Sequence, residues 1–314
     1  MYFEYRSIED MNKCIVSNLF KFPQNIDLIV GVPRSGMLPA NLLALYLNKP
    51  YTDIDSFIEG RVYSTGQRGK YISKTDGSVV LIIDDSVSTG YAICKIKEKL
   101  KNKSLEYNFI YSTVFVAPGS EHLIDIYCEV VHLPRVFQWN LFHHKQFVNN
   151  ACFDIDGVLC VNPPIDDDGE QYISYLKDAI PYIIPSHEID TLVTCRLEKY
   201  REITENWLNT HHVRYKHLIM LNFNTKAERI SWGKHGEYKG QVYKDSKNLL
   251  FVESSLSEAL KIAEVSNKIV YCTENFQMIY PHKTYYKFKG RYLSPILYNV
   301  KVFLYGILKK YLNK

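Results

Sequence analysis

Two kinds of hydrophobic pattern alternate along the chain. Short uninterrupted apolar runs are typical of strands buried in a parallel sheet, and apolar residues spaced every three or four positions are typical of helices. In the first half, apolar runs with helical stretches between them occur at 27–32, 79–85, 111–117 and 129–133. In the second half, they recur at 151–159, 190–196, 216–221, 248–255 and 267–273. This order predicts an α/β fold with two Rossmann-like parallel-sheet domains.

Length and local composition divide the chain further. A chain of 314 residues exceeds what one hydrophobic core usually serves, and the polar stretch FHHKQFVNN at 142–150 marks a boundary. We therefore expect domains at 1–147 and 148–280, followed by a tail at 281–314. With 46% hydrophobic and 23% charged residues, the composition is that of a globular protein and excludes a disordered or membrane-spanning chain.

The tail at 281–314 is basic and amphipathic. It contains eight Lys or Arg and no Asp or Glu, whereas the whole chain has a net charge of +4. Its apolar residues follow a helical period, which predicts a basic amphipathic C-terminal helix. Such a helix either makes a peripheral membrane contact or packs on its own domain. It contains too much apolar surface for a nucleic-acid-binding arm, so no nucleic acid is expected as a partner.

Cysteines and the N-terminus indicate the compartment. The seven cysteines form no CxxC pair, and their odd number argues against a disulfide framework. The first residues, MYFEYRSIEDMNK, show neither the basic nor the apolar region of a signal peptide. The sequence therefore predicts a cytoplasmic protein, with the tail as its one membrane-directed feature.

The stretch VVLIIDDSVSTG at 79–90 carries the candidate chemistry of the first domain. Ligands of open α/β sheets bind beyond the carboxyl ends of the strands. Small residues in a turn before a helix direct backbone N–H groups at a phosphate, and paired carboxylates accept hydrogen bonds from sugar hydroxyls. The pattern therefore predicts binding of a phosphorylated sugar. The candidate residues are Asp84, Asp85, Ser86, Val87, Ser88, Thr89 and Gly90.

This stretch resembles the PRPP-binding signature of type I phosphoribosyltransferases, and the turn VPRSG at 32–36 resembles their pyrophosphate loop. The resemblance implies a PRPP donor, with Asp84 and Asp85 on the ribose hydroxyls and 86–90 on the 5-phosphate. It also implies a basic catalytic loop between the two motifs, here with Arg61, Arg68 and Lys70. Ser88 stands where many members have a third acid, which argues against the usual transfer to a nucleobase. The residues implied for the diphosphate are Arg34, Ser35 and Gly36.

The second half contains CFDIDGVL at 152–159. Asp154 and Asp156 alternate along extended chain, so both project to one side. Two such carboxylates can share a hard cation and divide the roles of nucleophile and proton carrier. This stretch resembles motif I of the haloacid dehalogenase (HAD) superfamily, which implies an aspartyl-phosphate on Asp154 and general acid and base catalysis by Asp156.

Three further positions resemble the remaining HAD motifs. Thr194 ends the strand TLVTCR, Lys239 lies in HGEYKGQVY, and Glu253 ends LLFVE. Lys234 and Lys244 stay open as alternatives for the lysine. The resemblance implies Mg²⁺ held by Asp154, Asp156 and Glu253, although many relatives have two aspartates where this chain has Glu253 and Ser254. The short spacing between motifs predicts a minimal cap and a bulky substrate.

Together the two resemblances make the chain similar to dual-domain bacterial ribofuranosyltransferases. They imply transfer of 5-phosphoribose from PRPP to a glycan hydroxyl, with release of pyrophosphate, followed by removal of the 5-phosphate. The implied acceptor is a lipid-linked glycan of O-antigen or capsule assembly. A nucleotide-metabolism or stress-response enzyme and a PRPP-sensing regulator stay open as alternatives. Trp139, His143, His144, Asp53 and Asp55 are candidates either for acceptor contact or for structural roles.

Overall fold

The structure is a computed structural model that describes residues 3–63, 66, 77–103, 106–163 and 169–281. Arg68 and Lys70 of the predicted catalytic loop, and all of the predicted tail beyond residue 281, lie outside the described residues. The chain divides into two compact units, Met1–Leu141 and Phe142–Lys314. The division precedes the predicted boundary after residue 147. Phe142 explains the difference, because its ring packs against Phe153 of the second unit with centroids 5.9 Å apart.

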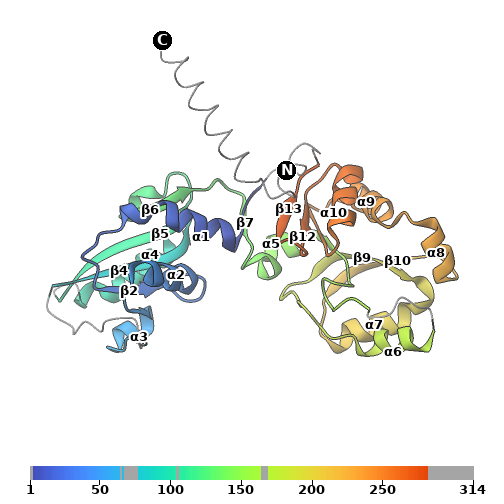
Figure 1. Ribbon diagram of the computed structural model, residues 1–314, viewed down its shortest axis with the longest axis horizontal. Coiled ribbons are helices and arrows are strands. Elements are labelled where there is room, and N and C mark those ends of the chain that lie inside the picture. Colours follow the sequence, from blue (N-terminus) through green and yellow to red (C-terminus); the bar gives the residue numbers. More distant parts are fainter. Residues whose placement is uncertain (1–2, 64–65, 67–76, 104–105, 164–168, 282–314) are drawn as a thin grey trace, which may run out of the picture. The chain divides into compact units, whose positions relative to one another are not determined.

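The first unit is built on a five-stranded parallel sheet with strand order β3-β2-β4-β5-β6 (Figure 1). Its strands are β2 (Leu28–Gly31), β3 (Tyr51–Asp53), β4 (Ser78–Val87), β5 (Tyr107–Val116) and β6 (Ile126–Val130). A separate parallel pair joins β1 (Glu4–Arg6) and β7 (Arg135–Phe137). The helices are α1 (Ile8–Ser17), η1 (Leu19–Lys21), α2 (Met37–Leu47), α3 (Ile54–Ile58), α4 (Tyr91–Leu100), η2 (Lys101–Lys103) and η3 (Glu121–Leu123).

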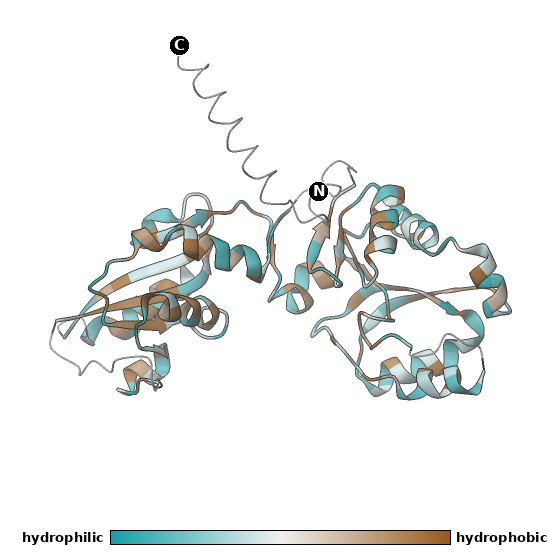
Figure 2. Ribbon diagram, viewed as in Figure 1, coloured by the Kyte–Doolittle hydropathy of each residue, from teal (hydrophilic) through white to brown (hydrophobic). Residues whose placement is uncertain are grey.

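Strand β4 shows why the sheet is parallel and buried. Its side chains alternate between two cores, with Leu81 and Ile83 in one and Val80 and Ile82 in the other. A strand covered on both faces needs apolar residues at successive positions, which is the run that the sequence contains. Figure 2 shows the same hydrophobic stretches on the central strands of both units. The predicted α/β fold with parallel sheets is confirmed.

The second unit contains a six-stranded sheet of order β10-β9-β8-β11-β12-β13. All neighbouring strands are parallel except β12 and β13, which are antiparallel. The strands are β8 (Ala151–Phe153), β9 (Ile189–Leu197), β10 (Tyr215–Leu221), β11 (Leu250–Glu253), β12 (Val270–Cys272) and β13 (Gln277–Ile279). The helices are α5 (Lys145–Val148), α6 (Glu170–Asp178), η5 (Glu198–Tyr200), α7 (Arg201–Thr210), α8 (Lys226–Trp232), α9 (His235–Asp245) and α10 (Leu256–Ser266), and η4 (Leu141–His143) spans the division between the units.

Side-chain caps set where several helices begin. Ser7 and Asp10 form a capping box at α1, and Thr225 and Glu228 form one at α8. Ser255 caps α10 directly after β11 and so fixes the chain just beyond Glu253. None of the described helices is both long enough and apolar enough to cross a membrane.

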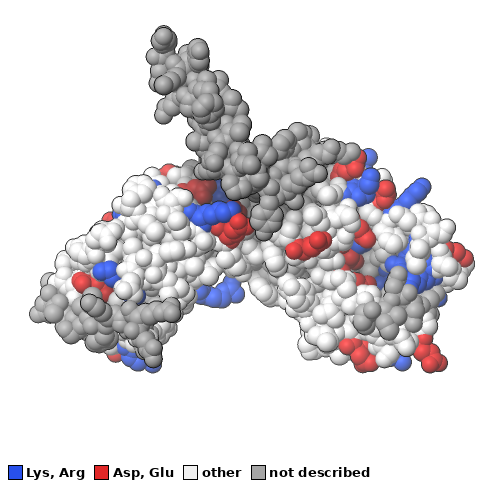
Figure 3. All heavy atoms as spheres, viewed as in Figure 1, with Lys and Arg blue, Asp and Glu red and all other residues white. Residues whose placement is uncertain are grey.

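Charged side chains are interspersed on the visible face of the described residues. Figure 3 shows Lys and Arg among Asp and Glu on both units rather than in one continuous basic field. Because residues 281–314 carry eight basic and no acidic residues, they account for the positive net charge of the chain.

Candidate functional site

Asp84 and Asp85 are buried in the second half of β4, with 8% and 4% of their surfaces exposed. Asp85 accepts hydrogen bonds from two other segments. Ser35 donates from Oγ to Oδ1 at 2.9 Å, and Trp139 donates from Nε1 to Oδ2 at 2.7 Å. The backbone N–H of Asp85 donates to Asp84 Oδ1 at 2.8 Å. The acid pair is therefore held between the turn after β2 and the segment after β7.

The turn predicted for a diphosphate packs directly on these acids. A Cβ atom at Gly36 would lie 2.9 Å from Asp84 Oδ1 and 2.5 Å from the carbonyl oxygen of Val32, so this position has room for glycine alone. Arg34, in the same turn, is exposed and donates to Asn140 Oδ1 at 2.7 Å. Arg34, Ser35 and the acid pair are thus linked to the segment that follows β7.

The structure corrects the predicted extent of the phosphate turn. Ser86 and Val87 belong to β4 and pair with β5, and the Val87 side chain is buried in an apolar cluster. They were predicted to bind phosphate, but the sheet pairing of this segment continues two residues beyond the acids. The turn itself consists of Ser88, Thr89 and Gly90 and leads into α4. Gly90 adopts a φ of 75°, which favours glycine.

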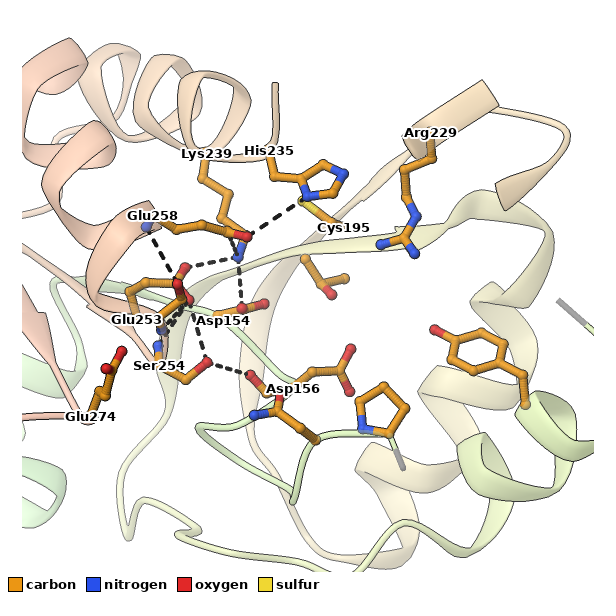
Figure 4. Close-up of a pocket in the computed structure, with 15 residues that line it drawn as sticks. Asp154, Asp156, Cys195, Arg229, His235, Lys239, Glu253, Ser254, Glu258 and Glu274 are labelled. Carbon is orange, nitrogen blue, oxygen red and sulfur yellow. Dashed lines mark hydrogen bonds and ion pairs between the residues drawn. The ribbon is translucent and has the colours of Figure 1, made fainter. Parts of the chain in front are cut away.

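In the second unit, a pocket of about 450 Å³ brings together all five predicted residues (Figure 4). They come from different elements: the end of β8, strand β9, helix α9 and the end of β11. Parallel strands bring their carboxyl ends to one edge, which is why these separate motifs meet. The five residues are Asp154, Asp156, Thr194, Lys239 and Glu253.

Lys239 lies at the centre of this pocket and is 3% exposed. Its Nζ lies 2.7 Å from Asp154 Oδ2, 2.8 Å from Glu253 Oε2 and 2.8 Å from Glu258 Oε2. Burial alone would lower the pKa of Lys239, but Asp154 and Glu253 raise it well above its usual value. Burial and the neighbouring carboxylates raise the pKa of Asp154, against the influence of Lys239. The ammonium group therefore ties three carboxylates together.

Asp156 is held by a different cation. Arg196 donates from Nη2 to Asp156 Oδ1 at 2.6 Å and from Nε to Oδ2 at 3.1 Å, and the Tyr175 hydroxyl donates to Oδ1 at 2.8 Å. Although burial opposes the effect, Arg196 lowers the pKa of Asp156. Thr194 accepts the backbone N–H of Arg196 through Oγ1 at 3.2 Å and is 1% exposed. The carboxylate of Asp156 is thus fixed in orientation beside the pocket.

Comparison with known families bears on the first unit. The family described as phosphoribosyl transferase domain matches residues 4–146. This part of the chain is a phosphoribosyl transferase domain. No match was found among curated proteins.

Similar solved structures include a purine phosphoribosyltransferase from Pyrococcus horikoshii, which is 21% identical and covers 44% of this chain and 94% of its own, with a TM-score of 0.34. The xanthine-guanine-hypoxanthine phosphoribosyltransferase of Helicobacter pylori is 16% identical over 44% of this chain and 93% of its own, with a TM-score of 0.34. The adenine phosphoribosyltransferase of Saccharomyces cerevisiae is 22% identical over 40% and 78%, with a TM-score of 0.27.

The acids of the phosphoribosyl transferase domain make its stability depend on pH. Burial and Asp85 raise the pKa of Asp84 to about 8, so the folded state binds this proton more tightly than the unfolded state. The resulting stabilisation is complete below the unfolded pKa near 4 and is lost as the pH rises towards 8. We expect Asp84→Asn to raise the free energy of unfolding of this unit by about 1–3 kcal/mol more at pH 8 than at pH 5.

Urea unfolding at the two pH values checks this. Asp55→Asn, at an exposed position of the same unit, is the control and should show no such pH-dependent gain. An equal effect of Asp84→Asn at both pH values would contradict the expectation.

The described residues of the second-unit pocket do not present the predicted set of three magnesium ligands. Asp156 was predicted as a metal ligand, but Arg196 and Tyr175 occupy its carboxylate. In the described ranges, no three His, Cys, Asp or Glu side chains are grouped so as to hold a metal. Asp154 and Glu253 are hard oxygen donors that both accept a hydrogen bond from Lys239, and Glu253 Oε1 also accepts the backbone N–H groups of Ser254 and Ser255. Four carboxylates, those of Asp154, Asp156, Glu253 and Glu258, face the two cations Lys239 and Arg196. This excess of negative charge suits a hard divalent cation.

Four residues in or next to the second-unit pocket were not predicted. They are Arg196, Tyr175, Glu258 and His235. Arg196 had a readable signal, because it lies two positions after Thr194 on the same strand and therefore on the same side. The alternatives for the lysine, Lys234 and Lys244, are both exposed.

Of the candidates for acceptor contact, Trp139 reaches the acids. Besides donating to Asp85, it stacks on Phe137 with ring centroids 4.8 Å apart and planes 6° apart. Asp53 instead caps α3 by accepting the backbone N–H groups of Asp55 and Ser56, each at 2.9 Å. The ring of His144 packs edge-on against Phe147 in the second unit, and His143 lies exposed in η4.

Proposed function

We propose that the chain is a two-step ribofuranosyltransferase of surface-polysaccharide assembly. The phosphoribosyl transferase domain provides PRPP-dependent transfer, and we assign a glycan hydroxyl as its acceptor. The second unit then acts as a HAD-type phosphatase that removes the 5-phosphate from the transferred ribose. The observation that carries the proposal is the pocket in which Lys239 joins Asp154 to Glu253 beside Asp156 and Thr194.

In the first step, the anomeric carbon of PRPP loses pyrophosphate and bonds to an acceptor oxygen, whose proton is released. Asp84 and Asp85 orient the ribose hydroxyls, and the turn Ser88–Gly90 binds the 5-phosphate at the start of α4. Ser35 links the diphosphate turn to Asp85 through its hydrogen bond. This hydrogen bond couples the position of the diphosphate of PRPP to that of its ribose.

In the second step, Asp154 attacks the phosphorus and the P–O bond to the 5-oxygen breaks. Asp156 gives this oxygen a proton and regains one from the water that hydrolyses the aspartyl-phosphate. Because Arg196 favours the charged form of Asp156, this side chain is better prepared to accept the proton of the attacking water than to donate one to the leaving oxygen. Lys239 and the Thr194 hydroxyl neutralise and position the phosphoryl group. Mg²⁺, held by Asp154 and Glu253, would supply further charge neutralisation.

The remaining parts of the chain fit this role. In the described residues, α6 is the one helix between β8 and β9, so the pocket has little to cover it and would admit a phosphate carried on a bulky glycan. The basic amphipathic sequence at 281–314 would concentrate the enzyme at the inner face of the cytoplasmic membrane, where lipid-linked glycans are extended.

The test is the stoichiometry of released phosphates. The full chain, PRPP and Mg²⁺ are incubated with lipid-linked glycans extracted from a bacterium that makes the chain, and with nucleobases in parallel. We expect pyrophosphate and inorganic phosphate to be released in equal amounts, and only with the glycan. Release with a nucleobase and not with the glycan would favour the nucleotide-metabolism alternative, and PRPP binding without release in either case would favour a PRPP-sensing regulator.

A further inference from the structure

His235 is the one pocket residue whose ring has a buried nitrogen without a partner among the described residues. It begins α9, four positions before Lys239, so both side chains extend from the same face of the helix. Both line the pocket that contains Asp154. Figure 4 shows the ring of His235 beside Lys239, between Glu258 and Arg229.

The two nitrogens of His235 have different surroundings. Nδ1 lies 3.7 Å from Glu258 Oε1. This distance is too long for a hydrogen bond, but because a carboxylate only accepts hydrogen bonds, Glu258 favours a ring proton on Nδ1. Nε2 is buried and makes no hydrogen bond within the described residues. With the ring proton on Nδ1, Nε2 is an acceptor and suits a partner that donates.

The chemistry of the pocket indicates which donor this is. A phosphate monoester dianion has acceptor oxygens and no proton to offer, whereas a sugar hydroxyl donates. A buried acceptor without a partner is costly, and substrate binding would remove that cost. We propose that His235 Nε2 accepts a hydrogen bond from a hydroxyl of the phosphorylated sugar and so makes the pocket selective for sugar phosphates. This inference rests on the proposed phosphatase function.

Two substrates distinguish a hydrogen bond between His235 and a sugar hydroxyl from a contact between His235 and the phosphate. Ribose 5-phosphate has hydroxyls, and p-nitrophenyl phosphate has the same phosphate group without them. In the full chain with Mg²⁺, His235→Asn places an amide near Nδ1 and removes the acceptor at Nε2, whereas His235→Gln extends an amide oxygen towards Nε2. We expect the ratio of kcat/KM for ribose 5-phosphate to that for p-nitrophenyl phosphate to fall about five- to thirtyfold in His235→Asn. His235→Gln should restore most of that ratio.

The control is His217→Asn, an exposed histidine on β10, which should leave the ratio at the wild-type value. If His235→Asn weakens both substrates equally, His235 contacts the phosphate and the inference is overturned. If the wild-type chain hydrolyses neither substrate, the proposed phosphatase function fails. Calorimetry with ribose 5-phosphate then still decides the inference, because weaker binding by His235→Asn supports it and equal binding overturns it.

Discussion

Replacing Lys239 with methionine should destabilise the second unit by about 3–5 kcal/mol, because it removes the cation from a buried ion cluster. The ammonium group contacts Asp154, Glu253 and Glu258 within 2.8 Å, and Asp154 and Glu253 are 5% and 1% exposed. Without it, these carboxylates stay buried next to one another. Their charges are then compensated only by taking up protons, so the loss should shrink as the pH is lowered.

Urea unfolding followed by tryptophan fluorescence measures this loss. In a Trp139→Phe background, Trp207 and Trp232 report on the second unit alone. Lys244→Met on the same helix is the matched control, and because Lys244 is exposed we expect a change within about 0.5 kcal/mol. A loss for Lys239→Met no larger than that of the control would show that the cluster contributes nothing to stability.

The strands that carry both sites could be predicted because burial on two faces leaves a distinct pattern. The runs at 79–85 and 190–196 correspond to β4 and β9, and each holds site residues near its end. Strands at the margins were missed. β1, β7 and β13 contain three residues each, and their sequences, EYR, RVF and QMI, include polar residues. β8 and β12 are equally short but lie within longer apolar runs, which made them visible.

The order of the motifs predicted which acids meet, but not how far each strand continues. Asp84 and Asp85 were read as the end of a strand, whereas pairing with β5 extends to Val87. Sequence shows the polarity of a residue and not whether its backbone is paired. Ser86 and Val87 were therefore assigned to the phosphate turn, although the turn begins at Ser88.

The partners of the site residues depend on packing between elements. Glu258 lies on α10, and its approach to Lys239 on α9 follows from how these two helices pack against each other. Trp139 reaches Asp85 from a segment 54 residues away in the chain. No local pattern encodes such contacts. The ion pair between Asp156 and Arg196 likewise changed the expected metal ligands, although both residues stand in the predicted motifs.

The second large effect concerns the order of the two steps. With PRPP carrying radioactive phosphorus in its 5-phosphate, the wild-type chain should move the label into inorganic phosphate in the presence of the lipid-linked glycan. Asp154→Asn removes the nucleophile, so phosphate release should fall at least about 10³-fold and the label should stay on the glycan. Asp245→Asn, at an exposed acid of the same unit, is the control and should release phosphate as the wild type does.

Replacing both acids of the first unit should stop the reaction one step earlier. In Asp84→Asn combined with Asp85→Asn, the ribose hydroxyls lose their carboxyl acceptors, so the label should remain in PRPP and neither glycan nor free phosphate should acquire it. The two variants therefore place the label in different molecules. Urea unfolding of Asp154→Asn, followed by the fluorescence of Trp207 and Trp232, shows whether its second unit is still folded. If Asp154→Asn still delivers unphosphorylated ribose to the glycan, Asp154 does not remove the phosphate. If it leaves the label in PRPP, removal of the phosphate precedes or drives the transfer, and the proposed order of steps is wrong.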